Sequence, residues 1–393
     1  MHRDPGRNKC QALPFGSHKN NSNWPEWVTV RDEIKIVGAI FSNRGDLEKL
    51  NTNLVSKCFF DLLNKSYGVK GTIFQKAYYV NTVLFSKIWY LAQCFSLDKK
   101  VLEKMLSKAL GFIYAGENER PIRPLNFRER SMGGIGLVNP VYKAQALLIK
   151  NVHKEFIKKG CDVNNPESYG GIYGCTQVFI NMFKSGVDFK STRHIYDFLI
   201  EGIICKNNSV IPSRSERRID GVKWSTAWKN VQIVRGLDAE EKVFSWKLQQ
   251  DMLLVGSRLH RPNADRSCKI VLPGNRLCQA IQSRRHLFIE CESVIDLFEF
   301  SRQVLEGMLQ KEVSENEVIH LSFNHRNKST LQCALWFAVK MLYKIYLDRG
   351  RNNCQLLMEI LKEIEWNIKL NRKIGSQNDM LRIRGFIEEY LGI

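Results

Sequence analysis

Apolar residues recur every three or four positions along most of the chain, which is the spacing of one face of an α-helix. The clearest helix follows Asp98, whose side chain, like that of Ser96, can cap a helix N-terminus. Its apolar stripe consists of Leu102, Met105, Leu106, Ala109, Leu110 and Ile113. Helical spacing also covers residues 46–116, 141–158, 224–260, 331–347 and 354–370.

Two short runs depart from this helical spacing. Residues 9–15 and 34–42 are rich in β-branched or aromatic residues and are bounded by polar, glycine- and proline-containing segments, so both indicate strands. Residues 206–223 are polar, basic and without a period, which makes them the best linker candidate. The predicted fold class is therefore mainly α with a small β part.

The charge of the chain suggests a polyanionic partner. Lysine and arginine outnumber aspartate and glutamate by 59 to 40, which gives a net charge of +19 spread along the chain. An excess of this size is typical of proteins that bind RNA or DNA, although a merely basic surface is the alternative. Lys100, Lys104 and Lys108 recur every four residues and form a row that is either a solvated face or a phosphate-binding face. Four arginines follow within eleven residues: Arg120, Arg123, Arg128 and Arg130.

Cysteine usage and apolar runs indicate the compartment. The chain has 11 cysteines without framework spacing, which favours free thiols in a reducing compartment. The N-terminus lacks an apolar signal core, and Lys87 interrupts the longest apolar run, so we expect neither a signal peptide nor a membrane span. We expect a protein of the cytoplasm or nucleus.

One segment has the residue types of a metal site. Residues 277–291 read LCQAIQSRRHLFIEC, in which Cys278, His286 and Cys291 have the spacing of zinc ligands. A structural zinc site needs four ligands, so one is missing from this segment. The alternative is that the segment binds no metal and only packs its apolar residues, Leu287, Phe288 and Ile289, into the core.

Several motifs in one order resemble reverse transcriptases of non-LTR (LINE-type) retrotransposons. The helix after the palm in that family has an N-x-x-x-x-S-K-[IL]-W-Y pattern, and a G-G-[IL]-G-[LV] segment and an A-x-x-L-x-x helix follow. Here Asn8–Lys9 and Ile34–Gly38 resemble the last palm strands, and FSWKLQQDMLLVGSRLH resembles the helix before the family's zinc region. The residues that match the post-palm patterns are Asn81, Ser86, Lys87, Ile88, Trp89, Tyr90, Gly133, Gly134, Ile135, Gly136, Leu137 and Ala146.

The resemblance implies a division of the chain into five parts. They are the end of the palm (1–45), a helical thumb (46–160), an irregular linker (161–223), a basic helical and zinc-knuckle-like region (224–300) and a helical C-terminal tail (301–393).

The same resemblance implies which zinc ligand is missing. The family pattern is C-x-x-C-x(7–8)-H-x(4)-C, and Asn275 stands where its first cysteine belongs. Asparagine is a poor zinc ligand. Cys268 could replace it if the Pro-Gly of the loop KIVLPGNRL reverses the chain, and His260 and Glu290 are weaker substitutes. Arg284 and Arg285 precede His286 and could contact phosphate with or without the metal.

Catalytic residues of the family are not found. RNA-directed DNA polymerases hold two Mg²⁺ ions with paired aspartates, whereas this sequence contains no Asp-Asp dipeptide and begins after the expected position of that turn. We therefore expect no Mg²⁺ site and no polymerase activity from this chain on its own, which leaves the palm-like Lys9 without its role. Isolated aspartates in the tail do not form a nuclease pattern, and we interpret His320 and His325 as incidental.

Two functional hypotheses follow. The first is a fragment of a LINE-type reverse transcriptase that retains sequence-tolerant binding of RNA, DNA or RNA–DNA hybrids. The second is a host protein derived from such an element, which acts as a helical scaffold for protein partners. Aromatic and apolar residues of the tail either present the partner face of that scaffold or pack the tail onto the rest: Trp336, Phe337, Met341, Leu342 and Tyr346.

Overall fold

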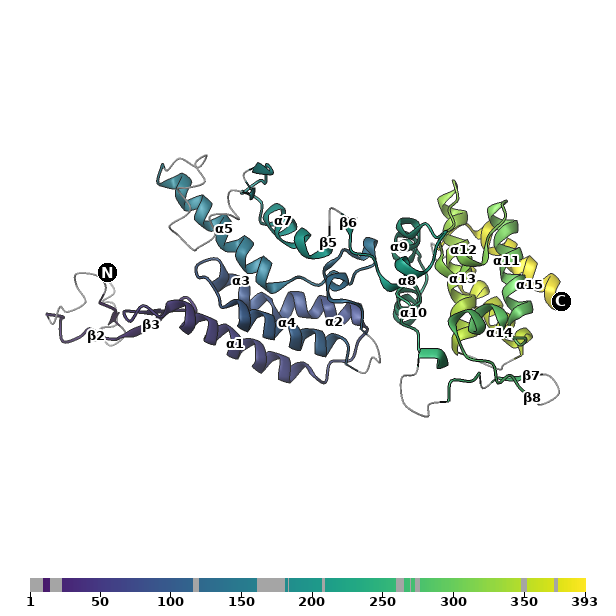
Figure 1. Cartoon of the computed structure of the whole chain (residues 1–393), viewed down its shortest axis with the longest axis horizontal. Coiled ribbons are helices and arrows are strands. Elements are labelled where there is room, and N and C mark those ends of the chain that lie inside the picture. Colours follow the sequence, from purple (N-terminus) through teal and green to yellow (C-terminus); the bar gives the residue numbers. More distant parts are fainter. Residues whose placement is uncertain are drawn as a thin grey trace. The chain divides into compact units, whose positions relative to one another are not determined.

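The protein is mainly α-helical, as the sequence predicts, with a small β part (Figure 1). The computed structural model describes residues 10–14, 23–115, 120–160, 181–182, 184–206, 209–258, 265–268, 270–272, 276–347, 352–370 and 374–393. The chain folds into two compact units. Unit 1 is 1–71, 75–115 and 137–209, and unit 2 is 72–74, 116–136 and 210–393. The division after residue 209 falls within the segment 206–223 that the sequence marks as a linker.

The β part of unit 1 consists of two pairs of short strands. β1 (Gln11–Ala12) pairs in parallel with β2 (Thr29–Val30), and β3 (Glu33–Ile36) pairs antiparallel with β4 (Ala39–Ser42). The prediction of one strand over 34–42 is wrong, because Val37 and Gly38 form a hairpin turn with φ of 48° and 89°. Two consecutive positive φ angles are the signature of the tight turn that matches strand twist.

Helices are the main elements of the described residues from 47 to 204. Asp98 caps α4, since its Oδ1 accepts hydrogen bonds from the backbone N–H groups of Lys100 (2.7 Å) and Val101 (3.3 Å). The predicted apolar stripe of α4 is buried except for Leu110, which is half-buried. The bounds are α1 (Leu47–Ser66), α2 (Ile73–Tyr79), α3 (Ser86–Ala92), α4 (Lys99–Ile113), α5 (Pro140–Lys158) and α7 (Thr192–Ile204), with a π-helical turn at Val80–Leu84.

The prediction that residues 161–223 are irregular is wrong for α7. This helix packs against α5, and their buried apolar residues share one cluster that includes Ile149 and Ile195. Tyr196 also accepts a hydrogen bond (2.9 Å) at its hydroxyl from the backbone N–H of Asn139, the residue that caps α5. The helical period of α7 was missed because glycine- and polar-rich segments on both sides dominate the pattern there.

Unit 2 is built around α13 (Lys328–Leu347), in which every residue from 333 to 342 is buried. Residues 224–258 are not one helical stretch: α-helix ends at Gln249, and a 3₁₀ turn follows at Gly256–Arg258. The tail has more helices than the two that periodicity predicts. A hairpin of β7 (Val271–Leu272) and β8 (Arg276–Leu277) lies between the helix that ends at Gln249 and the helices of the tail. The short strands β5 (Cys205–Lys206) and β6 (Ser209–Val210) lie at the boundary of the two units. The other helices are α8 (Arg214–Arg218), α9 (Trp224–Ile233), α10 (Ala239–Gln249), α11 (Ile295–Leu309), α12 (Glu315–His320), α14 (Asn353–Lys369) and α15 (Gln377–Leu391).

The tail residues offered above as a partner face belong to this core. Trp336, Phe337, Met341 and Leu342 are at most 2% exposed, and Tyr346 is half-buried. The packing alternative is therefore confirmed. Lys340 lies in the same core with its ammonium group paired to Glu241 (2.6 Å) and Glu363. Burial opposes the charge of Lys340, but the two carboxylates outweigh it and raise the pKa of Lys340. The two ion pairs link α13 to α10 and α14.

No helix in the described ranges combines the length and the apolar character that crossing a membrane requires.

The Gly-Gly-Ile-Gly segment of unit 2 depends on the absence of side chains. The carbonyl oxygen of Gly133 accepts hydrogen bonds from Trp246 Nε1 (2.9 Å) and Gln250 Nε2 (2.7 Å), which join it to α10. A Cβ on Gly133 would lie 2.7 Å from the Trp228 ring, and one on Gly134 would lie 2.0 Å from the carbonyl oxygen of Arg128. Gly133 is therefore required for close packing against Trp228, and Gly134 for close packing against the backbone of Arg128.

We predict that Gly134→Ala lowers the free energy of unfolding by about 1–3 kcal/mol, since the backbone at Arg128 must move. Gly385→Ala in α15 is the matched control in the same unit, because a Cβ there meets nothing within 4 Å and alanine favours the helix. Urea unfolding of both variants measures the difference. Equal stability of the two variants would contradict the packing described here.

His320 is buried in unit 2, with Nδ1 2.9 Å from Gln249 Oε1 and the ring 4.9 Å from that of Trp224. Burial lowers the pKa of its imidazole from 6.5 to about 3, and the charge of Arg284 adds to the effect. Below pH 6.5 the unfolded chain therefore binds a proton that the folded chain does not.

The free energy of unfolding should accordingly fall as the pH drops from about 6.5 towards 3, by at most about 1.4 kcal/mol per pH unit from this residue. His320→Asn keeps a hydrogen-bond donor for Gln249 without a titrating ring. Urea unfolding at several pH values between 4 and 7 should show a weaker acid dependence for the variant. An unchanged dependence would assign the acid sensitivity to other groups.

Candidate metal centre

Two of the predicted ligands lie on the short hairpin of unit 2. The backbone N–H of Cys268 donates to the carbonyl of Ala280 (2.7 Å), and that of Cys278 donates to Ile270 (3.0 Å). These bonds extend the β7–β8 ladder and place the two cysteines on facing strands. The chain reversal that would bring Cys268 to the site is therefore confirmed, while Asn275 and His260 lie outside the described residues.

The other two predicted ligands come from the turn that precedes α11. Residues His286–Glu290 form a single π-helical turn, and the N–H of Cys291 donates to the carbonyl of His286 (3.0 Å). The apolar residues between them, Leu287, Phe288 and Ile289, are buried. The core packing that we offered as the alternative to a metal site is thus present together with the ligands, and it fixes their positions.

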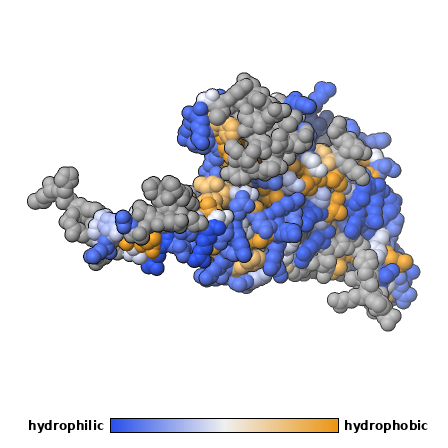
Figure 2. All heavy atoms as spheres, turned by 60° about the vertical axis from the view of Figure 1, so that its left-hand side comes forward, coloured by the Kyte–Doolittle hydropathy of each residue, from blue (hydrophilic) through white to orange (hydrophobic). Residues whose placement is uncertain are grey.

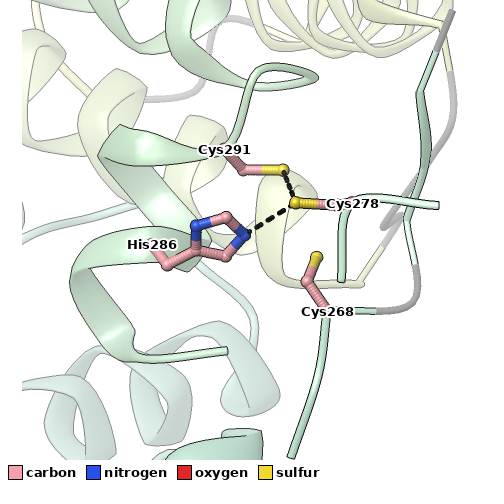
Figure 3. Close-up of side chains that lie close together, drawn as sticks. All are labelled: Cys268, Cys278, His286 and Cys291. Carbon is pink, nitrogen blue, oxygen red and sulfur yellow. Dashed lines mark hydrogen bonds between the residues drawn. The ribbon is translucent and has the colours of Figure 1, made fainter. Parts of the chain in front are cut away.

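The four side chains converge on one point (Figure 3). The ligand atoms of Cys268, Cys278, His286 and Cys291 all lie within 4.8 Å of one another. Cys278 Sγ is 3.3 Å from His286 Nε2 and 4.0 Å from Cys291 Sγ. A tetrahedral zinc site requires about 3.6 Å between sulfur and nitrogen and about 3.8 Å between sulfurs, given its bond lengths. These four residues can therefore hold a metal ion.

The protonation of the cluster depends on whether a metal ion is bound. Burial is the main cause that raises the pKa of the Cys268 thiol to about 12, and the neighbouring Cys291 and Cys278 contribute in the same direction. Burial also lowers the pKa of His286, which keeps its imidazole neutral as metal binding requires. A bound divalent cation would stabilise the thiolates that burial otherwise disfavours.

The surroundings of the ligands include one contact that the sequence did not reveal. The Ser293 hydroxyl lies 3.3 Å from Cys291 Sγ, at hydrogen-bonding distance for a thiolate. Such contacts orient metal ligands and tune their basicity. Nothing in the spacing of residue types marks Ser293, because its position depends on the turn after Cys291. Glu290, a weaker substitute ligand, is exposed and pairs with Arg285 at 2.7 Å.

The arginines beside the site, Arg284 and Arg285, form ion pairs with carboxylates. Arg284 NH1 lies 3.9 Å from Asp251, and Arg285 lies 2.7 Å from Glu290 and 3.1 Å from Glu315. A phosphate would have to compete with these partners, although the Arg285 side chain remains largely exposed. Their predicted contact with phosphate stays a prediction.

The other predicted nucleic-acid-binding residues fall into two groups. Lys100, Lys104 and Lys108 on α4 are exposed. Arg128 is different, since its side chain is 2% exposed and its NH1 lies 3.6 Å from Glu216. A guanidinium buried in this way cannot reach a phosphate, so the prediction for Arg128 is wrong. The remaining arginines are exposed: Arg120, Arg123 and Arg130.

Comparisons with known proteins give no match: no family model fits the chain, and no curated protein is similar to it.

We predict that the purified chain contains about one equivalent of bound metal, by element analysis, and that Cys268→Ser reduces it as strongly as Cys291→Ser. Both thiols belong to the same cluster, so either loss leaves three ligands. Cys354→Ser removes an exposed thiol of the same unit and should retain the full content. Less than a tenth of an equivalent in the unaltered chain would exclude the site, and full content in Cys268→Ser would exclude that ligand.

Proposed function

We propose that this chain is the downstream part of a non-LTR retrotransposon reverse transcriptase, with a thumb-like region in unit 1 and a zinc-binding region in unit 2. Its activity is sequence-tolerant binding of nucleic acid, preferably an RNA–DNA hybrid. The observation that carries the proposal is the exposed row of ammonium groups on α4, opposite a buried apolar stripe. Regularly spaced cations of this kind match the repeat of a phosphate backbone.

The neighbouring helix α1 extends this basic face. Thr52 Oγ1 accepts a hydrogen bond (3.1 Å) from the N–H of Asp98 near the start of both helices, and Tyr67 packs on Phe112 near their ends, so α1 and α4 run parallel. Between these points Lys104 Nζ lies 5.9 Å from the centre of the Phe60 ring. Lys57 precedes Phe60 by one helical turn and is exposed on the same side of α1.

The charge of this helical region points the same way. Residues 47–113 contain ten lysines and no arginine, against four acidic residues, which leaves a net charge of +6. Hydrophilic residues dominate much of the surface seen in Figure 2. A partly exposed aromatic ring among lysines can also stack on a base, which supports binding without sequence preference.

We propose further that the metal of unit 2 is zinc in a structural role. Three thiolates and one imidazole are a common donor set for structural zinc. All four tetrahedral positions are taken by protein ligands, so no position remains for water or substrate. The ion would hold the β7–β8 hairpin against the turn before α11 and would position the basic residues around them.

The alternative function, a helical scaffold for protein partners, has less support. The tail residues on which it depended are buried within unit 2 rather than exposed. The proposal for nucleic-acid binding rests on cations that are exposed, and the two functions differ in their response to nuclease.

Binding to an RNA–DNA hybrid should weaken steeply with salt, and K100Q/K104Q/K108Q should reduce the slope of log Kobs against log salt by about 1 per lysine lost. The matched control K154Q/K159Q/K190Q removes three exposed lysines elsewhere in unit 1. Fluorescence anisotropy between about 50 and 200 mM salt gives both slopes. The proposal fails if the unaltered chain does not bind at low salt, or if its affinity is independent of salt. Equal slopes of log Kobs against log salt for the two variants would show that α4 does not contact the nucleic acid.

A further inference from the structure

Unit 2 contains a cleft that is remote in sequence from the metal ligands and from α4. It has a volume of about 1070 Å³ and is lined by the end of α9, the turn after it, the start of α13 and the segment before α15. Five cationic side chains line it: Lys229, Arg235, Lys242, Arg326 and Lys328.

The charge of the cleft is of one sign. Among the residues that the structure describes, no aspartate or glutamate belongs to its lining, although the whole chain has 40 acidic residues. The five cations are exposed, and within the described residues none of them forms an ion pair. Elsewhere in unit 2, by contrast, Arg285 pairs with Glu290 and Lys340 pairs with Glu241. Like charges gathered in a concave site focus a positive potential and attract an anion.

The walls of the cleft are fixed by polar contacts between neighbouring elements. Asn230 on α9 donates from Nδ2 to the carbonyls of Leu321 (2.6 Å) and Phe323 (2.9 Å), which anchors the turn that carries Arg326. On the other side, the N–H of Arg235 donates to Gln332 Oε1 (3.1 Å) and so joins the turn after α9 to α13. The cations on these elements are therefore held near one another in the absence of a ligand.

Two glycines allow the elements at the floor of the cleft to pack closely against each other. Gly236 has φ of 75°, and a Cβ there would lie 2.4 Å from Ile374. A Cβ on Gly375 would lie 2.2 Å from Cys333 Sγ, inside α13. The segment before α15 therefore lies directly against the start of α13, where the positive end of the helix dipole adds to the charge of Lys328.

We propose that this cleft is a second binding site for nucleic acid, which holds the phosphate groups of the backbone and not the bases. The proposal rests on the proposed function, because it assigns unit 2 its own contact with the same class of ligand. Apart from His325, the described lining has no ring on which a base could stack, whereas it has five cations and several amides that can donate to phosphate oxygens. Recognition of this kind is independent of sequence and strongly dependent on salt.

The test compares two double variants of the full chain. K229Q/K328Q removes two lysines of the cleft, and K362Q/K369Q removes two exposed lysines of α14 outside it. Anisotropy with an RNA–DNA hybrid should show a salt slope reduced by about 2 for the cleft variant and an unchanged slope for the control. A second readout does not depend on affinity: a photo-crosslinker at Ile233, in the lining, should attach to a labelled hybrid, while one at the exposed Trp366 of α14 should not.

The outcomes separate this inference from the proposed function. If the unaltered chain binds and K229Q/K328Q leaves the slope unchanged with no crosslink at Ile233, the cleft inference is wrong and the proposed function stands. If the unaltered chain does not bind, both fail. Titration with inorganic tripolyphosphate distinguishes a small anion as the ligand: binding of tripolyphosphate that K229Q/K328Q abolishes, with hybrid binding intact, would also overturn the inference. A reduced slope together with the Ile233 crosslink supports it.

Discussion

The carbonyl group of Gly133 is the contact on which the arrangement of unit 2 depends. It accepts hydrogen bonds from the side chains of Trp246 and Gln250 and thereby fixes the end of α10. The chain then continues to Gly256, whose N–H donates to Gln282 Oε1 in the returning part of the hairpin (3.1 Å). A backbone contact between glycine and tryptophan is thus linked, through one helix, to the segment that carries the metal ligands.

In the candidate metal centre, apolar packing orders the turn before α11, and metal binding would order the hairpin. Leu287, Phe288 and Ile289 fix the turn that carries His286 and Cys291, and they require no metal to do so. The hairpin has few residues to bury and two-stranded hairpins are marginally stable by themselves. Cys268 and Cys278 attach it to the packed turn only if an ion joins the four ligands. The free energy of binding a metal ion at these four ligands would therefore act mainly on the hairpin.

Periodicity predicted the features that depend on residues close in sequence. It failed where a contact with a residue distant in sequence determines the structure. The stripe and the cap of α4 were predicted because both follow from local spacing. The hairpin turn at Val37 was not, because a β-branched residue at positive φ contradicts its own preference. Arg128 was assigned to the surface because nothing near it in sequence reveals Glu216. The approach of Cys268 to Cys278 could be predicted only from the Pro-Gly sequence between them.

The ladder of the β7–β8 hairpin has a consequence for the chemistry of the site. Side chains alternate between the two faces of a strand, so a shift of the pairing by one residue would turn Cys268 or Cys278 to the opposite face. Only one alignment of the two strands presents both sulfurs to His286 and Cys291. An ion that requires all four ligands would therefore select the correct strand register, because its binding free energy stabilises that register and no shifted one.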